Sequence, residues 1–140
     1  MSRIFWDSNL FIYLFENNPQ YAQLVEDLYK KMLERRDQLF TSTLTVGEVL
    51  VKPMAAGDES LCRQYERILS STAAVIPFDA GVARRYAMVR ATTSIKGPDA
   101  VQLACASQAG VDLFVTNDNH LKGRHVEGVQ FIVALDQVPI

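Results

Sequence analysis

The sequence predicts an α/β protein, a three-layer α/β/α sandwich around a central, mostly parallel sheet of about five strands. Short apolar runs alternate with longer segments whose apolar residues recur at helical spacing. Strands that are separated by helices pair in parallel through right-handed crossovers. The chain has 140 residues, 49% of them hydrophobic, without an internal repeat, low-complexity tract or linker. We therefore expect residues 1–140 to form one domain with one core.

The first part of the chain is expected to form two strands and two helices. The short apolar runs 4–6 and 39–41 are interpreted as strands. Residues 8–16 follow the first run as an apolar helix, which the turn before Pro19 closes. Residues 21–36 are expected to form an amphipathic helix, because their apolar residues recur at helical spacing.

The middle of the chain is expected to add two helices and a third strand. A helix through residues 46–51 follows the second strand, and Pro53 and Gly57 are expected to terminate or kink it. Residues 60–69 continue as another helix. The apolar residues 74–77 are interpreted as the third strand.

The last part of the chain is expected to form two helices and two strands. Asp79 is expected to cap the first of these helices, and Pro98 to open the second, which Gly110 ends. Residues 111–115 and 129–133 are interpreted as the fourth and fifth strands.

Four acidic residues stand where a predicted strand or loop leads into a helix: Asp7, Glu48, Asp99 and Asp118. Asp7 and Asp118 follow the first and fourth strands, and Glu48 lies in the first turn or two of the helix after the second. In α/β sheets of this kind, sites form beyond the carboxyl ends of the strands. Asp99 begins a helix whose N-terminus can face the same end. The four carboxylates are therefore expected to meet at one edge of the sheet.

Such a group of carboxylates predicts a divalent metal site. Carboxylates that lie close together repel, and one or more of them holds a proton unless a hard cation supplies compensating charge. Mg²⁺ fits oxygen ligands, with Mn²⁺ as a possible substitute. One or two such ions make a bound water a better nucleophile and stabilise charge on a phosphoryl oxygen. The predicted chemistry is hydrolysis of a phosphodiester without a covalent enzyme intermediate.

The formal net charge of −2 permits a nucleic-acid partner. The 16 acidic residues include the four of the predicted site, and the remaining 12 stand against 14 basic residues. A divalent metal would offset the charge of the site and leave the basic side chains available for phosphates. Dispersed Lys and Arg residues on helices are also typical of a solvated surface.

Cysteine usage and the apolar runs indicate a cytoplasmic protein. Cys62 and Cys105 lie in helical patterns without a CxxC motif or a Cys/His cluster, so we expect buried free thiols and neither a disulfide nor a zinc site. The longest apolar runs are too short to cross a bilayer, and Asp7 interrupts any signal-peptide pattern.

Four short motifs, in this order, resemble those of the PIN-domain nucleases. They are the opening segment 4–9 (IFWDSN), the segment with Ser42 and Glu48, Pro98-Asp99-Ala100, and above all residues 114–118 (FVTND). The resemblance runs nearly from end to end, and the order and spacing are most similar to the VapC-type toxins of type II toxin-antitoxin pairs. It implies a PIN-like fold, Mg²⁺-dependent cleavage of RNA, and a homodimer that an antitoxin protein holds inactive. The acidic quartet that it implies is Asp7, Glu48, Asp99 and Asp118.

Neighbouring polar residues are assigned supporting roles. Asn9 can orient Asp7, although a turn or cap role is also open. Thr116 belongs to the Thr-x-Asp part of the family-like segment and is expected to position the scissile phosphate or a water. Asn117, in the middle of that segment, either supports the site or forms a turn. His120 lies beside the predicted site, where it contacts a phosphate or stays at the surface.

Each acidic residue of the quartet also has a purely structural interpretation. Asp7 can cap the helix that follows it. Thr45-x-x-Glu48 matches a capping box, in which Glu48 would bond the backbone of Thr45. Asp99 stands at a helix start, where acidic side chains favour the positive end of the helix dipole. Asp118 can form a turn.

Two other functions are compatible with an α/β fold of this length. A receiver-type signalling domain also has an acidic Mg²⁺ pocket, but it needs paired early acids and a late Lys at a strand end, which this chain lacks. A PIN-like scaffold that binds RNA or a protein partner without catalysis would have a degraded quartet, whereas all four acids are present here. Asp79 and Asp136 are interpreted as cap or surface residues outside the site.

Overall fold

The structure, a computed structural model, describes residues 1–140 and contains one parallel sheet. The strand order is β3-β2-β1-β4-β5, and every neighbouring pair is parallel. The α/β fold with a mostly parallel, five-stranded sheet that the sequence predicts is therefore confirmed. The strands are β1 (Arg3–Trp6), β2 (Gln38–Ser42), β3 (Ala74–Ile76), β4 (Val111–Thr116) and β5 (Val129–Ala134).

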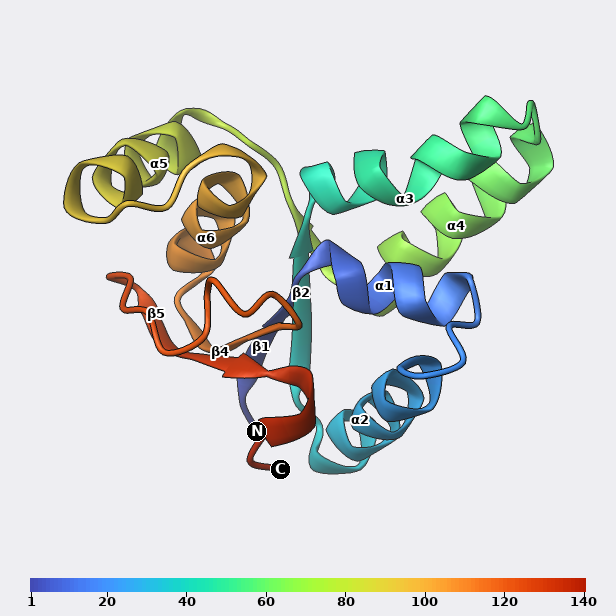
Figure 1. Cartoon of the computed structure of the whole chain (residues 1–140), viewed down its shortest axis with the longest axis horizontal. Coiled ribbons are helices and arrows are strands. Elements are labelled where there is room, and N and C mark those ends of the chain that lie inside the picture. The colour runs from blue at the N-terminus through green and yellow to red at the C-terminus, as the bar shows by residue number, and fades with distance from the viewer.

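Helices cover both faces of the sheet and give the molecule three layers (Figure 1). One face carries α1 (Ser8–Phe15), α2 (Ala22–Arg35), α3 (Thr43–Ala55) and α4 (Glu59–Thr72). The other face carries α5 (Ala80–Thr92) and α6 (Gly97–Ala109), which pack on each other. A 3-10 helix, η1 (Leu135–Gln137), follows β5 and contacts α2.

The sheet is buried on both faces, because successive side chains of a strand point to opposite sides. In β1, Phe5 packs in the layer of α5 and α6, whereas Ile4 and Trp6 pack in the layer of α1 to α4. All three side chains are at most 1% exposed. Phe5 stacks on Phe114 of β4, with the ring centroids 5.1 Å apart. These contacts fix the register of β1 and β4, and with it the positions of the residues that follow each strand.

Short polar side chains begin the helices that leave the sheet. Asp7 caps α1, and Ser42 caps α3 by accepting a hydrogen bond from the backbone N–H of Thr45. Asp79 caps α5, as the sequence predicts. Gly110 ends α6 in the left-handed conformation (φ 63°), which glycine adopts without strain.

Helix α3 runs further than its proline suggests. It continues through Pro53 and ends at Ala55. The carbonyl of Pro53 accepts a hydrogen bond from the backbone N–H of Asp58 (2.9 Å), and Gly57 turns the chain in a left-handed conformation (φ 69°). Pro53 therefore lies inside the last turn of α3, and Gly57 makes the turn into α4.

Both cysteines are buried free thiols, as predicted. Burial raises the pKa of the Cys105 thiol to about 11, and the charge of Asp79 adds to this effect. That thiol therefore stays protonated at neutral pH. None of the helices has the length and apolar character that a membrane span needs.

Candidate active site at the carboxyl edge of the sheet

The carboxyl ends of β1, β2 and β4 lie side by side at one edge of the sheet. Asp7 directly follows β1, Ser42 is the last residue of β2, and Thr116 is the last residue of β4. Helices α1 and α3 begin at this edge (Figure 1). The parallel sheet thus gathers residues that are more than a hundred positions apart in the sequence, such as Asp7 and Thr116.

Asp7 is buried at this edge, with 6% of its surface exposed. Its Oδ1 accepts a hydrogen bond from the backbone N–H of Ser8, and its Oδ2 accepts one from the hydroxyl of Thr116, each at 2.8 Å. The side-chain amide of Gln102 lies 3.5 Å from Oδ1 and donates to it. Asp7 therefore caps α1, as predicted. It is also a buried carboxylate that accepts hydrogen bonds from groups of α1, β4 and α6.

Glu48 lies in the second turn of α3 and is half-buried. Its Oε1 accepts a hydrogen bond from the hydroxyl of Ser8 at 3.0 Å. The capping-box interpretation of Glu48 is wrong, because α3 begins earlier than that motif requires. The backbone N–H of Thr45, which Glu48 would have bonded, is instead bonded to the Ser42 hydroxyl. Ser8 thus connects two carboxylates, because its hydroxyl bonds Glu48 and its backbone N–H bonds Asp7.

Asp99 and Asp118 approach the same edge from α6 and from the loop after β4. Both are half-buried, and Asp99 lies in the first turn of α6. Burial raises the pKa of Asp99, the charges of Asp118 and Glu48 raise it further, and His120 lowers it. The carboxylate of Asp118 also accepts a hydrogen bond from the backbone N–H of His120 at 2.9 Å, so Asp118 forms a turn as well.

The carboxylates of the quartet act on one another electrostatically. Burial raises the pKa of Asp7 to about 6; the hydrogen bonds from Thr116 and Ser8 oppose this rise, and the charges of Asp99 and Glu48 add to it. Together with the effect of Asp118 on Asp99, these interactions join the four side chains in one group. The structure therefore brings the four acids that the sequence singles out to one edge.

The chemistry of these side chains fits Mg²⁺. All of them offer carboxylate oxygens, the ligands of hard cations. Burial and the neighbouring carboxylates raise the pKa values of Asp7 and Asp99, and a cation would offset both effects. No three His, Cys, Asp or Glu side chains lie close enough together to enclose a metal ion. Mg²⁺ does not require such a cage, since it usually keeps several waters and takes one or two protein carboxylates.

The three supporting residues differ in their contacts. Thr116 is fully buried, and its hydroxyl oxygen also accepts a hydrogen bond from the backbone N–H of Asp118 at 3.0 Å. Asn117 donates a hydrogen bond through Nδ2 to the Tyr13 hydroxyl at 3.0 Å, which ties the loop to α1. Asn9 makes no hydrogen bond with Asp7, and its Oδ1 is buried without a partner.

Gln102, in α6, is a buried polar residue of this edge that the motifs do not include. It is 1% exposed, and its amide nitrogen donates to the Thr45 hydroxyl at 2.8 Å. Its amide oxygen accepts a hydrogen bond from the Ser42 hydroxyl. The hydroxyl of Thr41 also contacts Thr45, at 2.8 Å. Gln102 thus links the end of β2 and the start of α3 to Asp7, in a network that is satisfied inside the protein.

The sequence contains a signal for Gln102. It lies three positions after Asp99, so both residues share one side of the helix. Of the two amides in α6, Gln102 stands between the apolar residues Val101 and Leu103, which indicates a polar partner in the core, because burying an amide without hydrogen bonds is unfavourable. What the sequence does not contain is which polar groups Gln102 meets.

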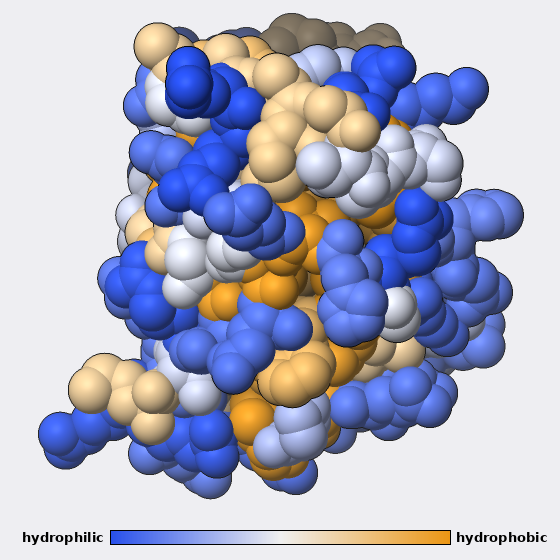
Figure 2. Space-filling view, turned by 90° about the vertical axis from the view of Figure 1, so that its left-hand side faces the viewer, coloured by the Kyte–Doolittle hydropathy of each residue, from blue (hydrophilic) through white to orange (hydrophobic).

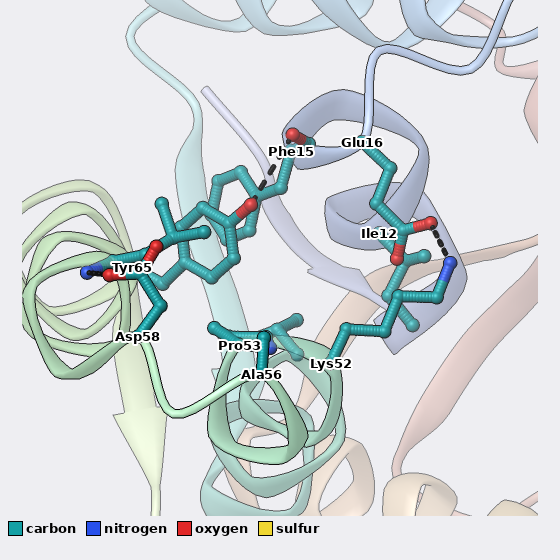
Figure 3. Close-up of a pocket in the computed structure, with 10 residues that line it drawn as sticks. Ile12, Phe15, Glu16, Lys52, Pro53, Ala56, Asp58 and Tyr65 are labelled. Carbon is teal, nitrogen blue, oxygen red and sulfur yellow. Dashed lines mark hydrogen bonds and ion pairs between the residues drawn. The ribbon is translucent and has the colours of Figure 1, made fainter.

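A second feature near this edge is an apolar pocket between α1, α3 and α4, with a volume of about 270 Å³ (Figure 3). Phe15 and Tyr65 stack at its side with ring centroids 4.5 Å apart, and Glu16 pairs with Lys52 at 2.6 Å across its mouth. Val49, the neighbour of Glu48, lines it. Six of its ten lining residues are hydrophobic and none belongs to the acidic quartet, so the pocket can accept apolar side chains.

Comparisons with known proteins agree with this fold. A model of the PIN domain matches residues 4–124. The chain is similar to a structure of VapBC2 from Rickettsia felis bound to a DNA fragment from its promoter, with a TM-score of 0.71 and 15% identity over 94% of this chain and 98% of that one.

Two further solved structures are similar over nearly their whole length. A toxin-antitoxin complex from Klebsiella pneumoniae has a TM-score of 0.63 and 25% identity, over 90% of this chain and 94% of that one. A DNA-bound VapBC from Salmonella typhimurium has a TM-score of 0.61 and 20% identity, over 96% of this chain and 99% of that one. A search of curated proteins found no significant sequence match. Since the PIN-domain model covers most of the chain, this protein belongs to the PIN-domain family, a family of nucleases that generally depend on a metal ion.

Proposed function

We propose that this protein is a Mg²⁺-dependent endoribonuclease and the toxin of a toxin-antitoxin pair, with residues 1–140 as one PIN domain. The observation that carries the proposal is the quartet of carboxylates at the carboxyl edge of a PIN fold, centred on the buried Asp7. A buried carboxylate with neighbouring acids is unfavourable for stability, and it is expected where a cation and a phosphate are to be bound.

Asp7, Glu48, Asp99 and Asp118 would hold Mg²⁺ together, one or two of them directly and the others through its bound waters, with Mn²⁺ as a substitute. When bound, this ion lowers the pKa of a coordinated water and neutralises charge that develops on the phosphoryl group. The protein contributes the placement of the ligands. Thr116 and the backbone of Ser8 each orient one oxygen of Asp7, and the Ser8 hydroxyl orients Glu48. These groups are fixed before substrate arrives, so little reorganisation is needed during the reaction.

Basic residues next to the quartet support a nucleic-acid substrate. Lys96 caps α6 three positions before Asp99, and Lys122 and Arg124 lie in the loop that follows Asp118. Cations beside an acidic metal site can bind the phosphates on either side of the bond that is cleaved. The choice of RNA over DNA follows from the similarity to VapC-type toxins.

An antitoxin protein is the proposed partner, since the similar Klebsiella pneumoniae structure is a toxin-antitoxin complex. An Arg or Lys of the antitoxin would pair with the carboxylates of the quartet and block the site. Apolar side chains of the antitoxin would enter the pocket between α1, α3 and α4 (Figure 3).

A homodimer is also proposed. The face that carries α5 and α6 shows apolar surface between polar side chains (Figure 2). Phe78, which packs edge-on against Tyr86 of α5, is 47% exposed. Exposed apolar surface of this kind is typical of protein interfaces.

The proposed activity is tested with a fluorescent single-stranded RNA and the purified protein in Mg²⁺, Mn²⁺ or excess chelator. Cleavage is expected with either metal and none with chelator. Glu48→Gln is expected to lower kcat/KM at least about a hundredfold, because it keeps the acceptor for Ser8 but loses the charge. The matched control is Glu127→Gln, an exposed acid outside the quartet, which is expected to leave the rate unchanged.

Two results would contradict this proposal. Undiminished cleavage in excess chelator would exclude the metal-dependent mechanism. Binding of RNA without cleavage in any metal would replace it with the non-catalytic scaffold.

A further inference from the structure

A polar cavity of about 380 Å³ lies beside the loop that carries Asp118, and no member of the acidic quartet lines it. We name it the flank pocket. Its size falls within the usual range for ligand pockets. The residues that line it are Gln20, Tyr21, Leu24, Asn117, Asn119, Lys122, Leu135 and Asp136.

The flank pocket joins the quartet through the loop after β4. Asn117, which lines the pocket, stands between Thr116, which bonds Asp7, and Asp118. Asn117 also bonds the hydroxyl of Tyr13, whose ring lies against that of Tyr21 with the centroids 4.7 Å apart. The lining residue Asn117 is therefore the immediate neighbour of Asp118. An RNA strand that is bound at the acidic site passes next to the flank pocket.

Both walls of the flank pocket are held in place by the protein. On one side, the Oδ1 atom of Asn18 accepts hydrogen bonds from the backbone N–H groups of Gln20 (2.9 Å) and Tyr21 (3.0 Å). On the other side, the carbonyl of Asp118 accepts one from the backbone N–H of Leu121 (3.1 Å), which shapes the turn between Asn119 and Lys122. The pocket is therefore largely formed before a ligand enters, which reduces the loss of entropy on binding.

The lining combines the groups that a nucleotide needs. Tyr21 offers an aromatic ring for stacking, with Leu24 and Leu135 as apolar neighbours. The side chains of Gln20 and Asn119 make no hydrogen bond within the protein, so their donors and acceptors are free to meet a base edge. Lys122 forms no ion pair within the protein and can contact a phosphate.

Asp136 adds a preference among the bases. It lines the flank pocket, and its exposed carboxylate is neither paired with a cation nor hydrogen-bonded within the protein. A carboxylate only accepts hydrogen bonds. It therefore favours guanine, adenine and cytosine, which present an amino group, over uracil, whose one ring N–H lies between two carbonyl oxygens that repel the carboxylate.

We propose that the flank pocket binds one unpaired nucleotide of the RNA beside the cleaved bond and selects a base with an amino group. This inference rests on the proposed ribonuclease function. Tyr21 stacks on the base, Asp136 and the amides read its edge, and Lys122 holds a phosphate. The pocket thus determines sequence preference, while the quartet determines whether cleavage occurs.

The test uses a single-stranded RNA that is randomised around its centre, cleaved in Mg²⁺ by the full-length protein, with sequencing of the products. One position beside the cleaved bond is expected to be depleted of uracil. Asp136→Asn is expected to remove that depletion while cleavage continues. Asp27→Asn, an exposed acid of α2 outside the pocket, is the control and is expected to keep it.

Stacking and phosphate contacts are tested separately on one preferred RNA. Tyr21→Leu and Lys122→Ala are each expected to lower kcat/KM roughly tenfold, whereas Tyr21→Phe, which keeps the ring, retains most of the rate. Lys30→Ala, an exposed lysine of the same helix as Leu24, serves as the control for charge. Wild-type cleavage with no depletion of uracil, or a depletion that survives Asp136→Asn, would overturn the inference and leave the ribonuclease proposal intact.

A binding experiment keeps the test independent of catalysis. Without metal, guanosine monophosphate is expected to shift the NMR signals of the Gln20 and Asn119 side-chain amides in a saturable manner, and uridine monophosphate to shift them less. Absence of any shift would refute the flank pocket as a nucleotide site. Weakened binding of a protein partner by Asp136→Asn, with unchanged preference for RNA bases, would instead make the pocket a protein surface.

Discussion

Asp7 combines two roles that conflict at the level of a single residue. As the cap of α1 it satisfies a backbone N–H and stabilises the helix. As a carboxylate that is 6% exposed and close to other acids, it destabilises the folded state whenever it is charged. Asparagine would perform the first role equally well, so the aspartate is explained by the metal that we propose.

We predict that Asp7→Asn abolishes RNA cleavage and stabilises the metal-free protein. The pKa of Asp7 is raised from 3.8 to about 6 in the folded state. Between these two pH values the folded state keeps a proton that the unfolded state has lost, so the stability of the wild-type protein falls as the pH rises through this range. The gain from Asp7→Asn is therefore expected to be absent well below pH 4 and complete well above pH 6, at roughly 1–3 kcal/mol. Urea unfolding at several pH values, followed through Trp6, measures it.

The same experiment with Mg²⁺ supplies the control for this prediction. Metal is expected to stabilise the wild-type protein more than Asp7→Asn, because only the wild type has the full set of ligands. A variant that is less stable than the wild type at pH 7 without metal would contradict the account of Asp7.

Gln102 gives a second prediction at this scale, because it satisfies several buried hydroxyls. Gln102→Leu leaves the Ser42 and Thr45 hydroxyls without their amide partner, and each loss costs about 1–3 kcal/mol. We expect the free energy of unfolding to fall by roughly 2–4 kcal/mol. Gln108→Leu, an exposed residue of the same helix, is the control, with an expected change of at most about 0.5 kcal/mol. Equal effects of the two changes would refute a structural role for the Gln102 network.

The candidate site was predictable to the extent that its residues follow strands. Asp7 and Asp118 come after short apolar runs, and the parallel sheet dictates that the ends of such runs share an edge. The position of Glu48 depends on where α3 begins. The capping-box interpretation of Glu48 is wrong because Ser42, and not Thr45, caps α3. The sequence indicates that Gln102 has a polar partner but does not predict its role, because that role depends on contacts with β2 and α3 that sequence spacing does not encode.

At the scale of elements, hydrophobic periodicity predicts the strands and helices well because each element buries one or two faces. The expected strand 4–6 is β1 (Arg3–Trp6), and the expected helix 21–36 is α2 (Ala22–Arg35). Boundaries shift by a few residues, as for α4, which extends beyond the expected 60–69. Proline alone did not end α3, because a proline near the last turn removes only one backbone donor there.

The C-terminus of α2 offers a test of these boundary rules. Arg36 adopts the left-handed conformation (φ 60°) that normally favours glycine, and its side chain is exposed and unpaired. We predict that Arg36→Gly stabilises the protein by about 0.5–1 kcal/mol, because the strain of a side chain in this conformation is relieved. Thermal unfolding measures the change.

Gly110 allows the reverse exchange as a control. It ends α6 with a similar φ of 63°, and a Cβ there would meet no atom within 4 Å. Gly110→Ala is therefore expected to destabilise by about 1 kcal/mol through backbone strain alone. Changes of the same sign for Arg36→Gly and Gly110→Ala would contradict the explanation.

At the scale of the whole molecule, the proposed site of cleavage and the proposed site for a protein partner lie in different parts of the fold. The carboxyl edge of the sheet gathers the acidic quartet and the flank pocket, while the layer of α1 to α4 forms the apolar pocket (Figure 3). Val49 lines that pocket and is next to Glu48 in α3. Lys52, which also lines the pocket, lies one turn of α3 after Glu48 and on the same side of the helix. A partner segment that fills the apolar pocket can therefore extend a basic side chain to the quartet.

This arrangement leads to the last prediction, which concerns control of the activity in a cell. Expressed alone, the wild-type protein is expected to arrest growth, because an open ribonuclease site degrades cellular RNA, and Asp7→Asn is expected to be harmless at the same protein level. Co-expression with the product of a neighbouring small gene should restore growth and yield a stable complex on size-exclusion chromatography. Within that complex, loss of the basic side chain that pairs with the quartet should restore cleavage while the partner stays bound, since the apolar pocket still holds it. Growth unaffected by the soluble, metal-loaded wild-type protein would remove the toxin assignment and leave a PIN-domain nuclease with another role.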